Sequence, residues 1–168
     1  MRPATIGYPI NGKMRTISKR TQYGLKAVLH LAAHYGEGPI LIATISEEEM
    51  IPIKFLELIL LNLKSRGLLA SKKGKGGGYE LSRPPSTVTV GSLIRMMEGP
   101  LAPLPCASET AFEPCEECPD VEACGIRIIM RRVRDAMADV LDKTTLTDLL
   151  RDVDRFRQKK TPVLMFDI

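Results

Sequence analysis

Four cysteines lie close together in one segment of this 168-residue chain, and they are its only cysteines. Their spacing is Cys106-x8-Cys115-x2-Cys118-x5-Cys124. Four thiolates complete a tetrathiolate site for Zn²⁺, and thiolates are also the usual ligands of iron–sulfur clusters. The first residues lack the apolar core of a secretion signal, so a metal or redox centre is favoured over a disulfide scaffold. The spacing by itself indicates an iron–sulfur cluster and zinc about equally, with a thiol switch as a third interpretation.

Charge divides the chain into two parts with different expected partners. Residues 1–105 contain 14 Lys or Arg against 7 Asp or Glu, whereas residues 106–168 contain 10 against 13. The basic part is suited to a polyanion such as DNA. Six acidic side chains and no basic one lie between Cys106 and Cys124. Such a segment would lower the reduction potential of a cluster bound there.

The densest basic stretch runs from Lys64 to Lys75 without an acidic residue, and it leads into a turn from Lys72 to Gly78 with the sequence KKGKGGG. Glycines allow a backbone to approach a DNA groove closely, and Lys72, Lys73 and Lys75 would hold phosphates or reach into the minor groove. Taken alone, such a turn is more often a solvated hairpin tip, and it matches no phosphate-binding loop or dinucleotide-binding spacing. The turn therefore indicates DNA binding only together with the elements around it.

The segments that must position these groups are mostly helical, and two short apolar strands flank the basic turn. The sequence predicts helices over 21–35, from Thr44 or Ser46 to Met50, over 52–66, 90–98, about 125–143 and 146–153, with strands over 68–71 and 79–81. Pro52 is expected in the first turn of its helix, where its missing N–H is not needed. The buried face of that helix is predicted to consist of Phe55, Leu56, Ile59, Leu60 and Leu63.

Three short helices followed by a basic-tipped hairpin are the element order of a winged helix-turn-helix. We therefore predict a mainly α fold with a small β-hairpin wing, in which a winged helix-turn-helix precedes a long dimerisation helix. The expected organisation is a flexible N-terminal tail over 1–13, a DNA-binding domain over 14–100, a cysteine-rich cluster-binding loop over 101–124, a dimerisation helix and short terminal helix over 125–153, and a C-terminal tail over 154–168. Met14 is a second candidate for the translation start.

The helix that begins at Pro52 is the candidate recognition helix, which in a helix-turn-helix lies in the major groove. Its outward side is predicted to present Lys54, Glu57, Leu58 and Leu61, followed by Lys64 and Ser65. Lys54 can donate to guanine or to a phosphate, and Glu57 can accept from a cytosine amino group. Leu58 and Leu61 offer only apolar contact, to a thymine methyl group or to a neighbouring helix, so little direct base readout is expected.

The long helix predicted after the cysteines carries a continuous apolar stripe. This stripe holds more apolar surface than one small winged helix can cover. We therefore favour a helix packed against its symmetry mate in a homodimer over a helix folded back onto its own domain. The stripe consists of Ile126, Ile129, Met130, Val133, Met137, Val140 and Leu141.

Four stretches together resemble the BadM/Rrf2 family of bacterial winged-helix regulators, which includes IscR-, NsrR- and CymR-like proteins. They are MRTISKRTQYGLKAVLHLA, IPIKFLELILLNLKSRGLLASKKGKGGGYELSRPP, VTVGSLIRMMEGPL and the cysteine segment that runs into the long helix. The resemblance covers about Met14 to Val153. It implies a homodimer that binds a pseudo-palindromic operator, often with a 2Fe–2S or 4Fe–4S cluster whose state alters the affinity for DNA.

The resemblance also assigns ligands. The family's three cluster cysteines correspond to Cys106, Cys118 and Cys124. At the two positions from which family members take a fourth ligand, this chain has Arg127 and Gln22, and both are poor ligands. Cys115 is an extra thiol, and we expect it to be the fourth ligand.

On the DNA side, the resemblance matches the recognition-helix pattern at Pro52, Lys54, Phe55 and Glu57, and the wing pattern at Gly77, Gly78 and Tyr79. Leu58 stands where the family usually has glutamine, so a hydrogen-bonding group is replaced by an apolar one. Lys73 stands where arginine is common, which keeps the charge without the planar fork of a guanidinium group.

The sequence therefore predicts a cytoplasmic, homodimeric transcriptional regulator that binds a double-stranded DNA operator and senses iron–sulfur status, nitric oxide or redox state through its cysteines. The alternative is a cluster-free or zinc-stabilised repressor controlled by a protein partner, and an electron-transfer or cluster-transfer module is less favoured. No catalytic arrangement of residues is recognisable, so the chain is not expected to be an enzyme. No apolar run is long enough to span a bilayer, so membrane association is not expected either.

Overall fold

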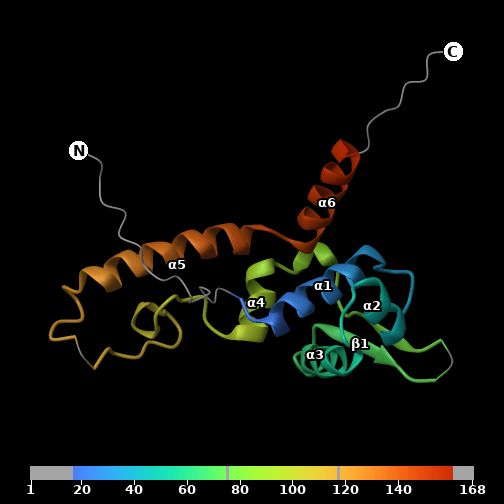
Figure 1. The fold of residues 1–168 in the computed structure, drawn as a ribbon, viewed down its shortest axis with the longest axis horizontal. Helices are drawn as coiled ribbons and strands as arrows, with labels where there is room; N and C mark the ends of the chain where they lie inside the picture. Colours follow the sequence, from blue (N-terminus) through green and yellow to red (C-terminus); the bar gives the residue numbers. More distant parts are fainter. Residues whose placement is uncertain (1–16, 75, 117, 161–168) are drawn as a thin grey trace, which may run out of the picture.

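A winged helix-turn-helix fills one end of the molecule, and a single long helix leads away from it (Figure 1). The computed structural model describes residues 17–74, 76–116 and 118–160. The elements in chain order are α1 (Lys19–Ala33), α2 (Ile42–Glu48), α3 (Ile53–Ser65), β1 (Leu69–Lys72), β2 (Gly78–Leu81), the short 3₁₀ helix η1 (Pro85–Thr87), α4 (Val90–Glu98), the 3₁₀ helix η2 (Pro105–Ala107), α5 (Gly125–Lys143) and α6 (Leu146–Lys160). The fold is mainly helical with one antiparallel hairpin, as the sequence predicts.

Some sequence expectations concern residues beyond this description. The expected tail over 1–13, the candidate start at Met14, the wing residue Lys75 and residues 161–168 lie outside the described residues. Within the described chain, α6 continues to Lys160, so the predicted end of that helix at Val153 is wrong by seven residues. The helix predicted over 21–35 ends two residues early, at Ala33, and leaves Tyr35 exposed.

The hydrophobic core lies between α1, α3, α4 and the hairpin. Val28, Leu56, Leu60, Leu63 and Leu93 have no more than trace exposure to solvent. Complete burial of side chains of this size contributes about 1.5–3 kcal/mol each to folding. The first turn of α6 joins the same core through Leu146, which is completely buried. The core therefore fixes the positions of both the α2–α3 pair and the junction between α5 and α6.

The helix-turn-helix is formed by α2, a short turn and α3. Ser46 closes the turn, because its hydroxyl donates to the carbonyl oxygen of Ile51 at 2.7 Å and its own carbonyl accepts from the Ile51 N–H at 2.9 Å. Met50 adopts a left-handed conformation there, with φ of 53°. The prediction that Thr44 or Ser46 caps α2 is wrong: the helix begins at Ile42, after Leu41, and no side chain caps it.

Pro52 lies immediately before α3 rather than inside its first turn. Its carbonyl oxygen accepts from the N–H groups of Phe55 and Leu56, so it starts the hydrogen-bonding pattern of the helix. Leu56 and the other predicted core residues of α3 are buried, but Phe55 is 59% exposed. The prediction that Phe55 belongs to the buried face is therefore wrong, because its position on the helix lies at the margin of the apolar stripe.

The wing is an antiparallel pair in which Leu69 faces Leu81 and Lys72 faces Gly78. A second connection ties it to the body of the domain, since Ile40 and Tyr79 exchange two backbone hydrogen bonds of 2.9 Å. A Cβ atom on Gly78 would collide with the backbone of Ile40, which explains the glycine at this position. The wing is therefore held against the segment before α2.

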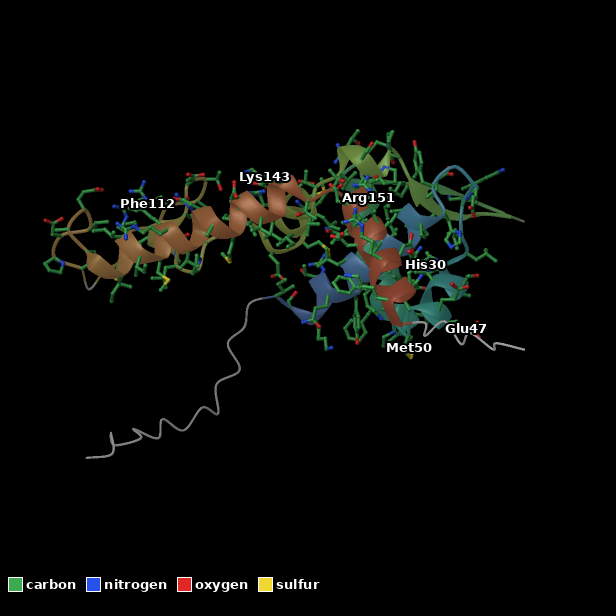
Figure 2. All side chains as sticks on the ribbon, turned by 90° about the horizontal axis from the view of Figure 1, so that it is seen from above. His30, Glu47, Met50, Phe112, Lys143 and Arg151 are labelled. Carbon is green, nitrogen blue, oxygen red and sulfur yellow. The ribbon has the colours of Figure 1, made fainter. Side chains whose placement is uncertain are left out.

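The helix α5 spans Gly125–Lys143, as predicted, and extends away from the winged domain with the cysteine-containing loop beside its first half (Figure 1). In Figure 2, Phe112 of that loop lies beside the first half of α5, and Lys143 lies at its opposite end, next to the winged domain. Among the helices of residues 17–74, 76–116 and 118–160, none is both long enough and apolar enough to cross a membrane.

Candidate nucleic-acid interface and cysteine pocket

The exposed side of α3 carries the polar groups that the sequence assigns to DNA contact. Lys54, Glu57 and Lys64 are all exposed. The ammonium group of Lys64 also donates to the Ser71 hydroxyl at 2.6 Å, which links the end of α3 to strand β1 of the wing. The structure thus presents α3 and the wing as neighbouring parts of one surface. Direct contact of these residues with DNA remains a prediction.

The wing presents Lys72 and Lys73 to solvent, whereas Lys75 lies outside the described residues. Gly77 is buried, and its N–H donates to the carbonyl oxygen of Gly74 at 2.9 Å to close the turn. A Cβ atom on Gly77 would collide with the carbonyl of Lys72. Gly77 and Gly78 are therefore required by the geometry of the wing itself, whether or not they also approach DNA.

The four cysteines line a single pocket of about 290 Å³ at the start of α5. Cys106 comes from η2, Cys115 and Cys118 from the following loop, and Cys124 from the residue that precedes α5. The other walls are formed by Leu104, Val121, Ile126 and Arg127. The sequence prediction that these four thiols belong to one site is consistent with this arrangement. Cys115 is the most exposed of the four.

Two of the thiols interact directly. Cys124 occupies the N-cap position of α5, and hydrogen bonding from the backbone N–H of Arg127, followed by the thiol of Cys118, lowers the pKa of Cys124. Conversely, the hydrogen bond to Cys124 is the main reason that the pKa of Cys118 is raised. A helix N-terminus stabilises negative charge, so Cys124 is the cysteine best placed to carry a thiolate.

Two arginines of α5 hold the loop in place. The guanidinium group of Arg127 donates to the carbonyl oxygen of Cys106 at 3.0 Å and pairs with Glu122 at 3.1 Å. About two turns further along the same helix, Arg134 is only 7% exposed and donates to the carbonyl oxygen of Ala107 at 2.6 Å. Sequence reasoning missed these roles. The available signal was their seven-residue spacing, which places both on one face of α5, at the edge of the apolar stripe.

The donor set suits an iron–sulfur cluster or Zn²⁺, because four thiols meet in one otherwise largely apolar pocket. The sulfur positions are less suitable: in residues 17–74, 76–116 and 118–160, no three Cys, His, Asp or Glu side chains are arranged so that they could hold a metal ion. The cysteines therefore fit such a group by type and location. Binding would require the loop to bring the sulfur atoms closer together.

A winged helix with an exposed, lysine-edged recognition helix defines the class of DNA-binding transcriptional regulators. Residues 17–152 match the family model described as "Rrf2: Iron-dependent Transcriptional regulator", so the chain belongs to the Rrf2 family. It is 39% identical to a putative HTH-type transcriptional regulator, rrf2-like, from Rhodobacter capsulatus, over 80% of this chain and 91% of that protein. These relatives are transcriptional regulators, and the chain is a regulator rather than an enzyme.

Two solved structures show the same fold. One is CymR, the global cysteine regulator of B. subtilis, with a TM-score of 0.66, 35% identity, and coverage of 79% of this chain and 94% of CymR. The other is T. potens IscR, also with a TM-score of 0.66, at 29% identity and coverage of 86% and 90%. These similarities confirm the winged-helix architecture and the resemblance to the family.

Proposed function

We propose that this chain is a homodimeric regulator whose affinity for its operator depends on an iron–sulfur cluster bound by Cys106, Cys115, Cys118 and Cys124. The observation that carries the proposal is the convergence of all four thiols on one pocket at the N-terminus of α5. Bound there, a cluster would supply a centre that responds to iron supply, nitric oxide or oxidants. Because the target is chromosomal DNA, the proposal places the protein in the cytoplasm.

The residues around the pocket would transmit the state of the cysteines to α5. Arg127 holds the carbonyl of Cys106, and Cys124 is joined directly to the first residue of the helix. Any rearrangement that draws Cys106 toward Cys124 therefore acts on the first turn of α5. At the other end of α5, the N–H of Val90 donates to the carbonyl of Thr144 at 2.9 Å, which connects the helix to the start of α4.

The exposed stripe of α5 supports a homodimer. Ile126 and Val140 are each 64% exposed, and Ile129 and Val133 are 47% and 39% exposed. These positions fall on one side of the helix at three- and four-residue steps, opposite the side that carries Asp135. A second copy of the chain would cover them, because an apolar stripe of this length matches itself in an antiparallel or crossed helix pair.

The second candidate function is a cluster-free or zinc-stabilised repressor. Its cluster-free form, though not its zinc-stabilised form, is supported by the observation that, within the described residues, no three Cys, His, Asp or Glu side chains are arranged to hold a metal ion. It is also consistent with the similarity to CymR. In this case the cysteines would act as a thiol switch or a zinc site, and a protein partner would control DNA binding.

Anaerobic purification of the full chain distinguishes these functions. The main proposal expects iron and sulfide in the parent protein and neither in the variant with all four cysteines replaced by serine. A gel shift against the DNA upstream of its own gene should give different affinities for the cluster-loaded and cluster-free parent. Thr110→Ala, in the same loop, is the matched control and should behave as the parent does.

Two outcomes would contradict the main proposal. The first is a quadruple variant that binds the duplex as the parent does under every redox condition. The second is a colourless parent protein with stoichiometric zinc, which would support the alternative. Retention of full cluster loading by Cys115→Ala would show that Cys115 is not the fourth ligand.

A further inference from the structure

The outward face of α3 is largely apolar at its centre. The buried face of this helix is formed by Leu56, Ile59, Leu60 and Leu63. At 100° per residue, the line opposite that face runs through Lys54, Leu58, Leu61 and Ser65. Leu58 is 67% exposed and Leu61 is 53% exposed. Two large aliphatic side chains therefore occupy the middle of the surface that faces away from the domain.

These two leucines are not needed by the fold. Neither belongs to the core or to the partly buried residues packed against it. Leaving such side chains in water is unfavourable, so their exposure indicates a surface that is covered in the functional state.

The charges around the leucines favour duplex DNA over an apolar protein partner. Lys54 precedes them on α3, Lys64 and Arg66 follow them, and Lys72 and Lys73 lie on the adjoining wing, all exposed. Glu57 is the one acidic residue of α3. A surface of this kind, with cations at both ends of the helix face and on the wing beside it, is complementary to the phosphates that border a groove.

Inside the major groove, an aliphatic side chain can distinguish bases in only one way. It neither donates nor accepts hydrogen bonds, so the amino and carbonyl groups of the base edges are not partners for it. The one apolar group that the four standard bases present there is the C5 methyl of thymine. A leucine placed over a G·C pair would instead remove water from polar edges without replacing its hydrogen bonds, which is unfavourable.

We propose that Leu58 and Leu61 form a methyl-reading pair that selects thymine at the operator positions beneath them. This inference rests on the proposed placement of α3 in the major groove, and it adds the chemical group that is recognised. The same pair should accept 5-methylcytosine, because that base carries its methyl group at the equivalent C5 position. It should disfavour uracil and unmethylated cytosine.

The test uses a duplex recovered by the full-length protein from a pool of randomised DNA. Each thymine of the recovered site is replaced in turn by deoxyuridine, which removes only the methyl group. Fluorescence anisotropy at fixed salt should show one or two positions in each half-site where the affinity falls about three- to fourfold, the amount expected for loss of one buried methyl. Substitution by 5-methylcytosine, paired with guanine, should restore part of that loss.

Variants assign the effect to the two leucines. Leu58→Ala and Leu61→Ala should each remove the sensitivity to deoxyuridine at one position, and their melting temperatures should match the parent because both side chains are exposed. Leu58→Gln should shift the preference toward adenine, which glutamine recognises through two hydrogen bonds. Lys64→Gln is the control: it should weaken binding to every duplex and reduce the salt dependence, while the methyl effect remains.

The inference is overturned if uracil substitutes for thymine at every position without loss of affinity, or if the alanine variants keep the sensitivity of the parent. In both cases the parent still binds the recovered duplex, so the proposed regulatory function stands. If the protein recovers no duplex from the pool, both the inference and the proposed function fail, and the leucines would face a protein instead.

Discussion

The guanidinium group of Arg95 and the carboxylate of Asp142 face each other across the junction of α4 and α5, with nitrogen–oxygen distances of 2.5 and 2.9 Å. Two parallel hydrogen bonds of this kind fix an orientation as well as a distance. Gly91 makes the approach feasible, because a Cβ atom at this position would collide with the Asp142 carboxylate. The pair connects the winged domain to the end of α5 opposite the cysteines.

Asp142→Asn should lower stability at neutral pH by about 0.5 kcal/mol, since both partners are about two-fifths exposed and the pair is partly screened. The hydrogen bond from Arg95 lowers the pKa of Asp142 in the folded protein from its ordinary value of 3.8. The stabilisation is therefore present above pH 3.8 and is lost as the pH falls through the lowered pKa. Urea unfolding at several pH values should show the difference between parent and variant shrinking on the acid side.

Asp139→Asn provides the control for this experiment. Asp139 pairs with Lys143 within α5 and makes no link to α4. Its replacement removes the same charge from the same helix, and it should change stability by less than the Asp142 variant. Equal effects of the two substitutions would show that the α4–α5 link contributes nothing of its own.

Arg134→Gln should loosen the cysteine-containing loop. The carbonyl of Ala107 would lose its donor in a position that is only 1% exposed, which costs about 1–3 kcal/mol locally. Hydrogen exchange and limited proteolysis should then show faster opening of residues 101–124. Arg132→Gln, on the exposed side of the same helix, should leave the loop as protected as in the parent. Matching exchange rates in the two variants would refute a holding role for Arg134.

Val133→Asp should separate the proposed dimer into monomers. Val133 lies in the middle of the exposed stripe of α5 and is 39% exposed in the single chain. A dimer related by a two-fold axis would bury two carboxylates. We therefore expect the dissociation constant of the dimer to rise about a hundredfold. Light scattering after size-exclusion chromatography measures the mass. Arg131→Asp places an acidic residue on the exposed side of α5 away from the stripe and should leave the mass unchanged; a monomeric parent would contradict the dimer outright.

Met50→Gly should stabilise the protein. A non-glycine residue in the left-handed region costs about 1–2 kcal/mol, and Met50 is 83% exposed, so little packing is lost. The greater freedom of glycine in the unfolded chain offsets part of this gain. We expect a net gain of about 0.5 kcal/mol, which raises the melting temperature by about 1–2 °C. Glu47→Gly, inside α2, should act in the opposite direction, because glycine is unfavourable within a helix.

The elements that the sequence predicted best are those with strong local end signals. The N-terminus of α4 is capped by the Thr89 hydroxyl, which accepts from the Ser92 N–H, and Gly99 ends the helix with φ of 89°. The end of α6 was missed because its last turns lack an apolar period. Side-chain pairs such as Arg151 with Asp148 and Arg155 with Asp152 support it instead.

The cysteine pocket was predictable from spacing alone, whereas the groups that hold it were not. Arg127 and Arg134 donate to backbone carbonyls 21 and 27 residues away in sequence. Backbone acceptors have no sequence signature, so such pairs emerge only when the chain is folded. The Arg95–Asp142 pair joins two side chains, and it was missed because its partners are 47 residues apart in sequence.

In the proposed function, the length of α5 determines how small a change at the cysteines would be felt at the DNA-binding end of the molecule. A helix of 19 residues is about 28 Å long, with the thiols near one end and Asp142 near the other. It acts as a stiff rod, and a pivot of about 2° at one tip displaces the opposite tip by about 1 Å over that length. Hydrogen bonds to DNA bases tolerate little more misplacement than this. If the proposed function holds, a sub-ångström rearrangement of sulfur atoms would therefore be enough to alter operator binding without any atom of the pocket coming near the duplex.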